Sequence, residues 1–240
     1  MLLHLPTSVS EVQQHIAEGA LPIGGATLVW ATFQRDGFPD RAVSLRNLPE
    51  ANVLEADTLG SAVVLQRIDD RVPLVLRRAA STIGTGAVRR AATVGGNIVG
   101  STLRCLLPAA LVLNARATVL DSAGVYETDL TELLAKRPVL LSINWQTPLV
   151  SGYFKEDAPA GGPPPLVIAT AVHADAEGAH HLRLAVRDGY EFLTATAPCA
   201  PGLDAVLRAV EATDIGGLPA EVRARIREEI TDVLSRADGS

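Results

Sequence analysis

The sequence predicts an α+β fold in which a longer N-terminal region is followed by a smaller C-terminal domain. Over residues 1–145, short apolar strands alternate with segments of helical periodicity. Beyond residue 146 the chain changes to strand-like segments joined by a hairpin, and two helical segments close it. Hydrophobic residues make up 48% of the 240 residues, which is enough for a buried core. We therefore expect one α+β region over residues 1–145 and a smaller domain of a sheet and helices over residues 146–240.

The first region begins with a helix whose start is marked by a capping box. Ser8 supplies the N-cap hydroxyl, Glu11 follows three residues later, and Gly19 stops the helix. After this helix the pattern predicts strands at residues 21–23 and 42–45, helices at 58–68, 72–80 and 103–113, a hairpin at 119–126 and a strand at 139–145.

The second region is predicted to be mostly strand at first and helical at its end. The segment Asp175–Gly178 has the composition of a hairpin turn, and the Pro- and Gly-rich segment Ala158–Pro165 predicts a loop. The expected elements are strands at residues 149–155, 166–173 and 181–186, followed by helices at 202–213 and 219–236.

Composition excludes several classes of protein. The net charge is −6, from 21 Lys and Arg against 27 Asp and Glu, whereas nucleic-acid binding needs clustered positive charge. The uncharged run at residues 105–113 is far shorter than the roughly 20 residues of a membrane span, and no signal peptide is visible. Cys105 and Cys199 are the only cysteines, whereas an iron–sulfur cluster takes about four thiolates. We expect a cytoplasmic protein that binds neither nucleic acid nor a membrane and has no metal site of its own.

Two Gly-Gly pairs are the first candidates for a functional site. They stand in the segments Ile23–Thr27 and Thr93–Asn97, and each follows an apolar segment. Glycine lets the backbone approach a ligand closely and point successive amides at it, which suits a pyrophosphate. Neither segment has the Gly-x-Gly-x-x-Gly or P-loop pattern, and one pair alone favours a plain tight turn. The pairs indicate a common site only if they meet in space.

The second pair carries a resemblance to a known family. Residues 88–98, VRRAATVGGNI, resemble the segment IRN-x-ATIGGN-[IL] of the FAD-binding subunits of molybdenum hydroxylases, such as the medium chain of carbon monoxide dehydrogenase and the flavin domain of xanthine dehydrogenase. Residues 23–28, IGGATL, resemble the AGGTDL of that family and follow the first helix, as the family pattern requires. The likeness spans about residues 1–195.

The resemblance implies an FAD-binding fold of the vanillyl-alcohol-oxidase (PCMH) type, with two α+β subdomains divided near residue 55 inside residues 1–145. Both Gly-Gly turns would hold the FAD pyrophosphate with backbone amides, and Leu140 and Lys155 match contacts near the flavin ring. A cation there stabilises reduced flavin, although a solvated lysine at a strand end explains Lys155 equally well. No histidine stands near either turn in the sequence, so FAD is expected to be non-covalent. The implied FAD-binding residues are Ile23, Gly24, Gly25, Ala26, Thr27, Thr93, Gly95, Gly96, Asn97, Ser101, Leu140 and Lys155.

The chain also departs from the family pattern. An Asp that normally follows the second Gly-Gly pair and contacts the flavin side chain is missing, and Ser101 and Thr102 are the candidates to supply a hydroxyl in its place. Arg90 stands where the family has Asn, and the C-terminal domain is shorter than usual.

Three functions follow from these features. The first is an FAD-carrying electron-transfer subunit of a molybdenum-hydroxylase-type dehydrogenase, in an oligomer with iron–sulfur and molybdopterin subunits and with a small-molecule substrate or NAD. The second is a free-standing FAD-dependent enzyme acting on a small molecule. The third is a flavin-free relative that keeps the scaffold for binding. No catalytic residue is assigned in any of them.

Overall fold

The computed structural model describes residues 1–157 and 162–237, so part of the loop predicted at residues 158–165 lies outside the described residues. The chain divides into two compact units. Unit 1 comprises residues 1–72, 83–106 and 115–145, and unit 2 comprises residues 73–82, 107–114 and 146–240. Unit 2 thus takes two segments from the first 145 residues.

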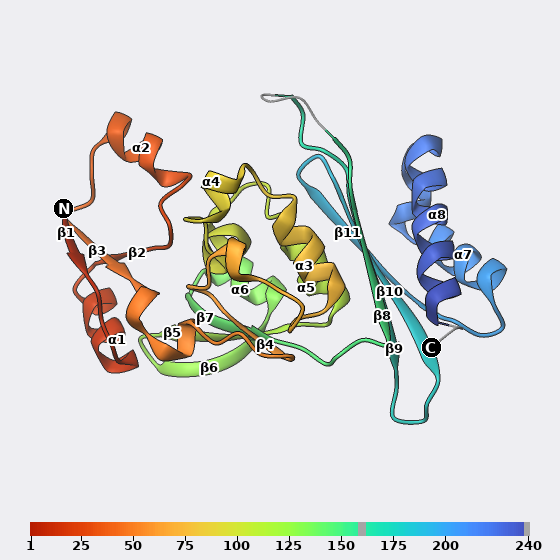
Figure 1. Ribbon diagram of the computed structural model, residues 1–240, viewed down its shortest axis with the longest axis horizontal. Coiled ribbons are helices and arrows are strands. Elements are labelled where there is room, and N and C mark those ends of the chain that lie inside the picture. The colour runs from red at the N-terminus through yellow and green to blue at the C-terminus, as the bar shows by residue number, and fades with distance from the viewer. Residues whose placement is uncertain (158–161, 238–240) are drawn as a thin grey trace. The chain divides into compact units, whose positions relative to one another are not determined.

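Unit 1 contains two sheets (Figure 1). The first is a parallel sheet of three short strands in the order β1-β3-β2, and the second is an antiparallel sheet in the order β4-β7-β5-β6. The strands are β1 (Leu2–His4), β2 (Leu21–Ile23), β3 (Arg41–Ser44), β4 (Thr58–Gly60), β5 (Arg116–Asp121), β6 (Gly124–Asp129) and β7 (Val139–Asn144). The helices are α1 (Val9–Ala17), α2 (Val29–Asp36), α4 (Gly86–Arg89) and α6 (Leu130–Lys136), with 3-10 turns at Leu45–Asn47, Pro49–Ala51 and Leu65–Arg67 and a π-helical turn at Gly96–Gly100.

The start of α1 forms largely as the capping box predicts. The Ser8 hydroxyl accepts a hydrogen bond from the Glu11 amide at 3.4 Å, which satisfies one of the open amides of the first turn. The Glu11 carboxylate accepts from the amide of Thr7 at 2.8 Å, one residue earlier than the usual partner. This bond is the main reason that the pKa of Glu11 lies below its usual value.

The predicted helix at residues 58–68 is wrong. Thr58–Gly60 is strand β4, in which Leu59 is the antiparallel partner of Ile143, and only the 3-10 turn Leu65–Arg67 is helical. Gly60 lies so close to the backbone of Ala51 that a Cβ there would overlap the Ala51 carbonyl. The apolar spacing over these residues therefore arises from two short elements that bury side chains on different neighbours.

Unit 2 is one antiparallel sheet in the order β11-β10-β9-β8, with helices on both faces. Figure 1 shows α3 and α5 against one face and α7 and α8 against the other. The elements are α3 (Leu74–Ser81), α5 (Leu107–Val112), β8 (Val150–Lys155), β9 (Val167–Ala174), β10 (His180–Asp188), β11 (Glu191–Pro198), α7 (Leu203–Glu211), a 3-10 turn at Asp214–Gly217 and α8 (Ala220–Ala237). Side chains of β9, β10, α7 and α8, including Ile168, Leu184 and Ile230, form one buried apolar cluster.

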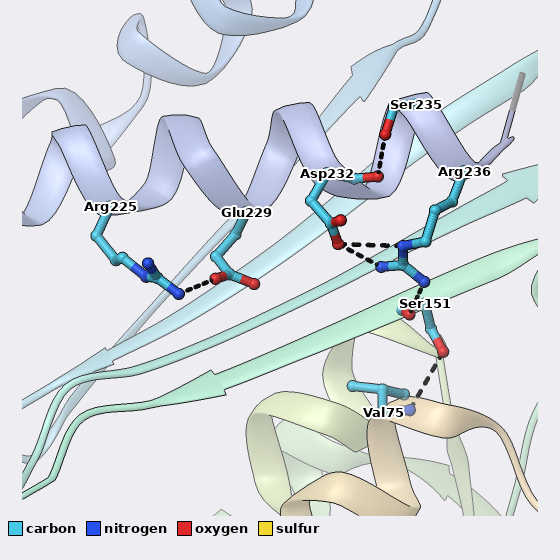
Figure 2. A network of polar contacts seen from close by, with 7 residues as sticks. All are labelled: Val75, Ser151, Arg225, Glu229, Asp232, Ser235 and Arg236. Atoms are coloured by element: carbon cyan, nitrogen blue, oxygen red, sulfur yellow. Dashed lines mark hydrogen bonds and ion pairs between the residues drawn. The ribbon is translucent and has the colours of Figure 1, made fainter.

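A polar network links β8 to a helix on each face of this sheet (Figure 2). The Ser151 hydroxyl accepts from the amide of Val75 in α3 at 3.2 Å. The Ser151 carbonyl accepts from Arg236 of α8 at 3.0 Å, and the same guanidinium pairs with Asp232 at 2.8 Å. The network positions both helices relative to the strand.

The predicted α+β class is confirmed, and most predicted strands and helices lie within a few residues of their expected ends. The sequence interpretation missed β1, α2, the short helix α4, α6 and β11. Among the described helices, none is both long enough and apolar enough to cross a membrane.

Candidate functional site

The first Gly-Gly turn leaves strand β2 and leads into helix α2. Ile23 ends the strand, and Ala26 has a left-handed backbone with φ of 55°, which is uncommon for a residue with a side chain. The Ala26 carbonyl accepts from the amide of Trp30 at 3.0 Å and so starts the first turn of α2. Gly24 and Thr27 are exposed, so this turn faces solvent in unit 1.

The backbone amides of this turn are open. Among the described residues, no hydrogen bond is made by the amides of Gly24, Gly25, Ala26 or Thr27. A row of open amides beside a left-handed residue is typical of backbone sites that bind anions. That this turn binds the phosphates of FAD stays a prediction of the sequence interpretation.

The second Gly-Gly turn is bonded to its own surroundings. The Val94 amide donates to the carbonyl of Val63 at 3.0 Å, and the Gly95 amide donates to that of Ser61 at 2.8 Å. The Gly96 amide donates to the Thr93 hydroxyl at 3.2 Å, and the Asn97 amide to the Thr93 carbonyl at 3.0 Å. These amides are therefore already satisfied within unit 1.

The structure brings the two turns together. A Cβ on Gly24 would overlap the Thr93 hydroxyl, and a Cβ on Gly25 would overlap the carbonyl of Ala91. The first turn therefore lies directly against the segment Ala91–Thr93, which leads into the second. At Gly25 the obstacle is backbone, so glycine is required there, whereas a Cβ on Gly24 would require the Thr93 hydroxyl to move.

Two predicted residues, Asn97 at the end of the second turn and Ser101 after it, use their side chains to bind the backbone of the segment that follows. The Asn97 side-chain oxygen accepts from the Leu106 amide at 2.8 Å, and the side chain is only 8% exposed. The Ser101 hydroxyl accepts from the amides of Leu103 at 3.1 Å and Arg104 at 3.4 Å. Its O–H donates to no residue in the described part of the chain.

The two residues expected near the flavin ring lie in different units. Leu140 is buried in β7 of unit 1, where it pairs with Val119 of β5. Lys155 ends β8 of unit 2, and its ammonium group donates to the carbonyl of Thr82 at 2.8 Å. Thr82 is the C-cap residue of α3, so Lys155 places a positive charge at the negative end of that helix.

Arg104, which follows the second turn by a few residues, has unusual geometry that sequence reasoning did not single out. Its backbone is left-handed with φ of 40°, and its Nε is buried without a hydrogen-bond partner among residues 1–157 and 162–237. Nothing in the sequence pattern distinguishes it from a surface arginine. The same described ranges hold no group of three or more His, Cys, Asp or Glu that is arranged for a metal ion.

The chain matches a known family over more than half of its length. Residues 1–142 match the family described as the FAD binding domain in molybdopterin dehydrogenase. This range includes both Gly-Gly turns and Arg104. Among curated proteins, none matches the sequence significantly.

Solved structures share the fold over the whole chain. Quinoline 2-oxidoreductase from Pseudomonas putida 86 aligns with a TM-score of 0.72 at 20% identity, covering 100% of this chain and 97% of the other. The Cu,Mo-CO dehydrogenase in its cyanide-inactivated form aligns with a TM-score of 0.75 at 18% identity, covering 100% and 98%. The reconstituted CO dehydrogenase from Oligotropha carboxidovorans gives 0.74 and 18%, with the same coverage. These likenesses establish the α+β fold, and the match over residues 1–142 establishes that the chain belongs to the FAD-binding domain family of molybdopterin dehydrogenases, a family of FAD-binding oxidoreductase components.

Proposed function

We propose that unit 1 binds FAD non-covalently, with the pyrophosphate on the open amides of the first Gly-Gly turn. The observation that carries this proposal is the set of unpartnered amides from Gly24 to Thr27. Hydrogen bonds from several neutral amides to one anion are charge-assisted and stronger than ordinary ones. The missing Cβ atoms of the glycines let a phosphate oxygen come within hydrogen-bond distance of the backbone.

In this proposal the second turn supports the first. Its amides are already bonded, so Thr93–Asn97 contributes a rigid wall and the Thr93 hydroxyl, against which Gly24 packs. Ser101 contributes an O–H that is free to donate to the cofactor. Ile23 fixes the start of the first turn by ending β2.

Leu140 and Lys155 are proposed to lie near the flavin ring, as the family resemblance implies. Lys155 already gives one N–H to the carbonyl of Thr82, so the two remaining ammonium N–H groups are the ones available to a flavin carbonyl. The proposal also keeps residues 1–145 as the FAD-binding domain, divided near residue 55, and residues 146–240 as the C-terminal domain.

The family match favours an electron-transfer role inside a larger oxidoreductase over a free-standing flavoenzyme or a flavin-free scaffold. Bound FAD supplies the ability to accept and pass on electrons, and the chain supplies binding and orientation. We propose iron–sulfur and molybdopterin subunits as its partners in an oligomer, and a small-molecule substrate or NAD as the species that exchanges electrons with the complex. A cytoplasmic location belongs to the same proposal.

Exposed apolar side chains in unit 1 support a protein partner. Most of the large apolar residues that are exposed in the described chain stand within the first 38 residues. Trp30 is 51% exposed and Phe38 43%, with their rings 5.3 Å apart, next to the first turn. Contiguous exposed apolar surface is typical of protein interaction sites.

The test is the visible spectrum of the purified full chain, followed by identification of the chromophore released on denaturation. We expect a flavin spectrum and the release of intact FAD. A colourless protein that does not take up added FAD contradicts the proposal and favours a flavin-free scaffold.

If FAD is present, a second experiment tests the partners. Iron and molybdenum in the complex purified from native cells support the subunit role, and full turnover by the isolated chain favours a free-standing enzyme.

A further inference from the structure

The segment after the second Gly-Gly turn is held in one conformation by its own hydrogen bonds. Gly96–Gly100 forms a π-helical turn, a geometry found frequently at functional sites. Asn97 then binds the amide of Leu106 at 2.8 Å and closes the segment back onto the turn. The Ser101 hydroxyl binds the amide of Arg104 at 3.4 Å. Arg104 is therefore fixed close to the turn by contacts on both sides of it in the chain.

Arg104 itself is held in an unfavourable state. A left-handed backbone is uncommon for a residue that is not Gly, Asn or Asp, and Arg104 has φ of 40°. A buried N–H group without an acceptor also costs free energy, and the Nε of Arg104 has none among the described residues. No ion pair within the same part of the chain includes Arg104. Strain and an unsatisfied donor at one residue point to a ligand that supplies the acceptor.

The two Gly-Gly turns lack positively charged side chains. The segments Ile23–Thr27 and Thr93–Asn97 contain no Lys or Arg, so the first turn binds a pyrophosphate through neutral groups alone and the second turn adds no positive charge. A pyrophosphate diester carries two negative charges, and a planar guanidinium is the side chain best suited to bind phosphate oxygens through more than one N–H.

We propose that Arg104 binds a pyrophosphate oxygen of FAD and supplies the positive charge that the Gly-Gly turns lack. This inference rests on the proposed function. When the cofactor binds, the guanidinium turns so that its Nε, which the protein itself covers in the free form, gains a phosphate oxygen as acceptor. The hydrogen bonds made by Ser101 and Asn97 hold the backbone around Arg104 in place before the cofactor arrives.

The experiment compares the full chain with Arg104→Gln and Arg104→Lys, each freed of flavin and titrated calorimetrically. The ligands are FAD, ADP, which carries a diphosphate without the flavin half, and riboflavin, which carries no phosphate. Arg104→Gln is expected to weaken FAD and ADP binding about tenfold or more, and Arg104→Lys less, because a charge-assisted hydrogen bond is lost or weakened. Riboflavin binding is expected to stay unchanged, and the salt dependence of FAD binding to become less steep.

Arg46→Gln is the matched control. Arg46 is an exposed arginine of unit 1, so this substitution removes the same charge at a different place. The apo form of Arg104→Gln is expected to unfold at the same temperature as the unaltered chain or higher, since its unsatisfied buried donor has been removed. A lower unfolding temperature together with equal losses for FAD and riboflavin would show a structural role and overturn the assignment. If Arg104→Gln binds FAD as tightly as the unaltered chain, the assignment of Arg104 is overturned and the proposed function is not. Failure of the unaltered chain to bind FAD overturns the proposed function as well.

Discussion

The turn at Gly24-Gly25 and the turn at Gly95-Gly96 share a dipeptide, but their backbone amides are used differently. In the first turn the four amides from Gly24 to Thr27 make no hydrogen bond within the described chain, and much of the turn is exposed. In the second turn the amides of Gly95, Gly96 and Asn97 are bonded to Ser61 and Thr93. The amides of the first turn are therefore available to a ligand, whereas those of the second turn are used within the protein.

The difference shows that the same Gly-Gly dipeptide has two roles, leaving amides open in one turn and allowing close packing in the other. In the first turn, glycine removes Cβ atoms that would overlap Ala91 and Thr93, and it leaves amides open to a ligand. In the second turn, Gly95 is needed because a Cβ there would stand 2.9 Å from the Cβ of Ser61. The Ser61 carbonyl accepts a hydrogen bond from the Gly95 amide and so keeps the two residues close together. Substitutions in the two turns should therefore separate cofactor binding from stability.

Gly25→Val is expected to have the largest effect. Its Cβ would overlap the Ala91 carbonyl, which belongs to rigid backbone, so the two turns must separate. We expect loss of FAD retention and a decrease of about 3 kcal/mol in the free energy of unfolding. Urea unfolding and the flavin content of the purified variant measure the two effects. Gly100→Val is the control, because a Cβ on Gly100 meets nothing within 4 Å. Full FAD retention by Gly25→Val would refute the contact between the turns.

Gly95→Ala should cost less and mainly in stability. The Ser61 Cβ must move to admit the new methyl group, which costs about 1–2 kcal/mol. Because the Gly95 amide is already bonded to Ser61, FAD affinity should fall no more than about threefold once the protein is folded. Calorimetric titration at a temperature where the variant is fully folded measures this. A hundredfold loss would mean that the second turn contacts the pyrophosphate directly.

Thr93→Val tests the bond inside the second turn. It removes the hydroxyl that accepts from the Gly96 amide, at a cost of about 1 kcal/mol, while the shape of the side chain is kept. Thr93→Ser should restore the lost stability in part. If Thr93→Val unfolds at the same urea concentration as the unaltered chain, this hydrogen bond does not hold the turn.

Gly96→Ala is expected to be the mildest change. Its Cβ would stand 3.1 Å from the Thr93 hydroxyl, which can shift slightly, so the stability loss should be about 0.5 kcal/mol. Gly100→Ala, in the same π-helical turn and with open space around it, provides the baseline. A loss at Gly96 larger than that at Gly95 would reverse the order of crowding that the structure gives.

Much of the fold follows from sequence patterns. The Ser8 N-cap, the β5–β6 hairpin at Asp121–Gly124 and the closing helices all have local signals, and the structure has them within a few residues. Helix α6 also has such a signal, because the Asp129 carboxylate caps the Glu132 amide at 2.8 Å, but it was missed. Strand β4 was misjudged, since its pairing with β7 depends on residues more than 80 positions away.

The site was only partly predictable. The Gly-Gly motifs and their order match a family pattern, so the two segments were found from the sequence alone. Their use of amides depends on whether a partner such as Ser61 stands opposite, which no local pattern encodes. Arg104 has no local signal either, because the burial of its Nε and its left-handed backbone arise from how residues 97–106 close on themselves.

The most direct test is the exchange rate of individual amide hydrogens, measured by NMR with and without FAD. Open amides exchange rapidly and bonded ones slowly. The account predicts that the amides from Gly24 to Thr27 exchange rapidly in the free protein and become protected when FAD binds, whereas those of Gly95–Asn97 are protected in both states. FAD binding that leaves the first turn unprotected would contradict the central claim that its open amides hold the cofactor.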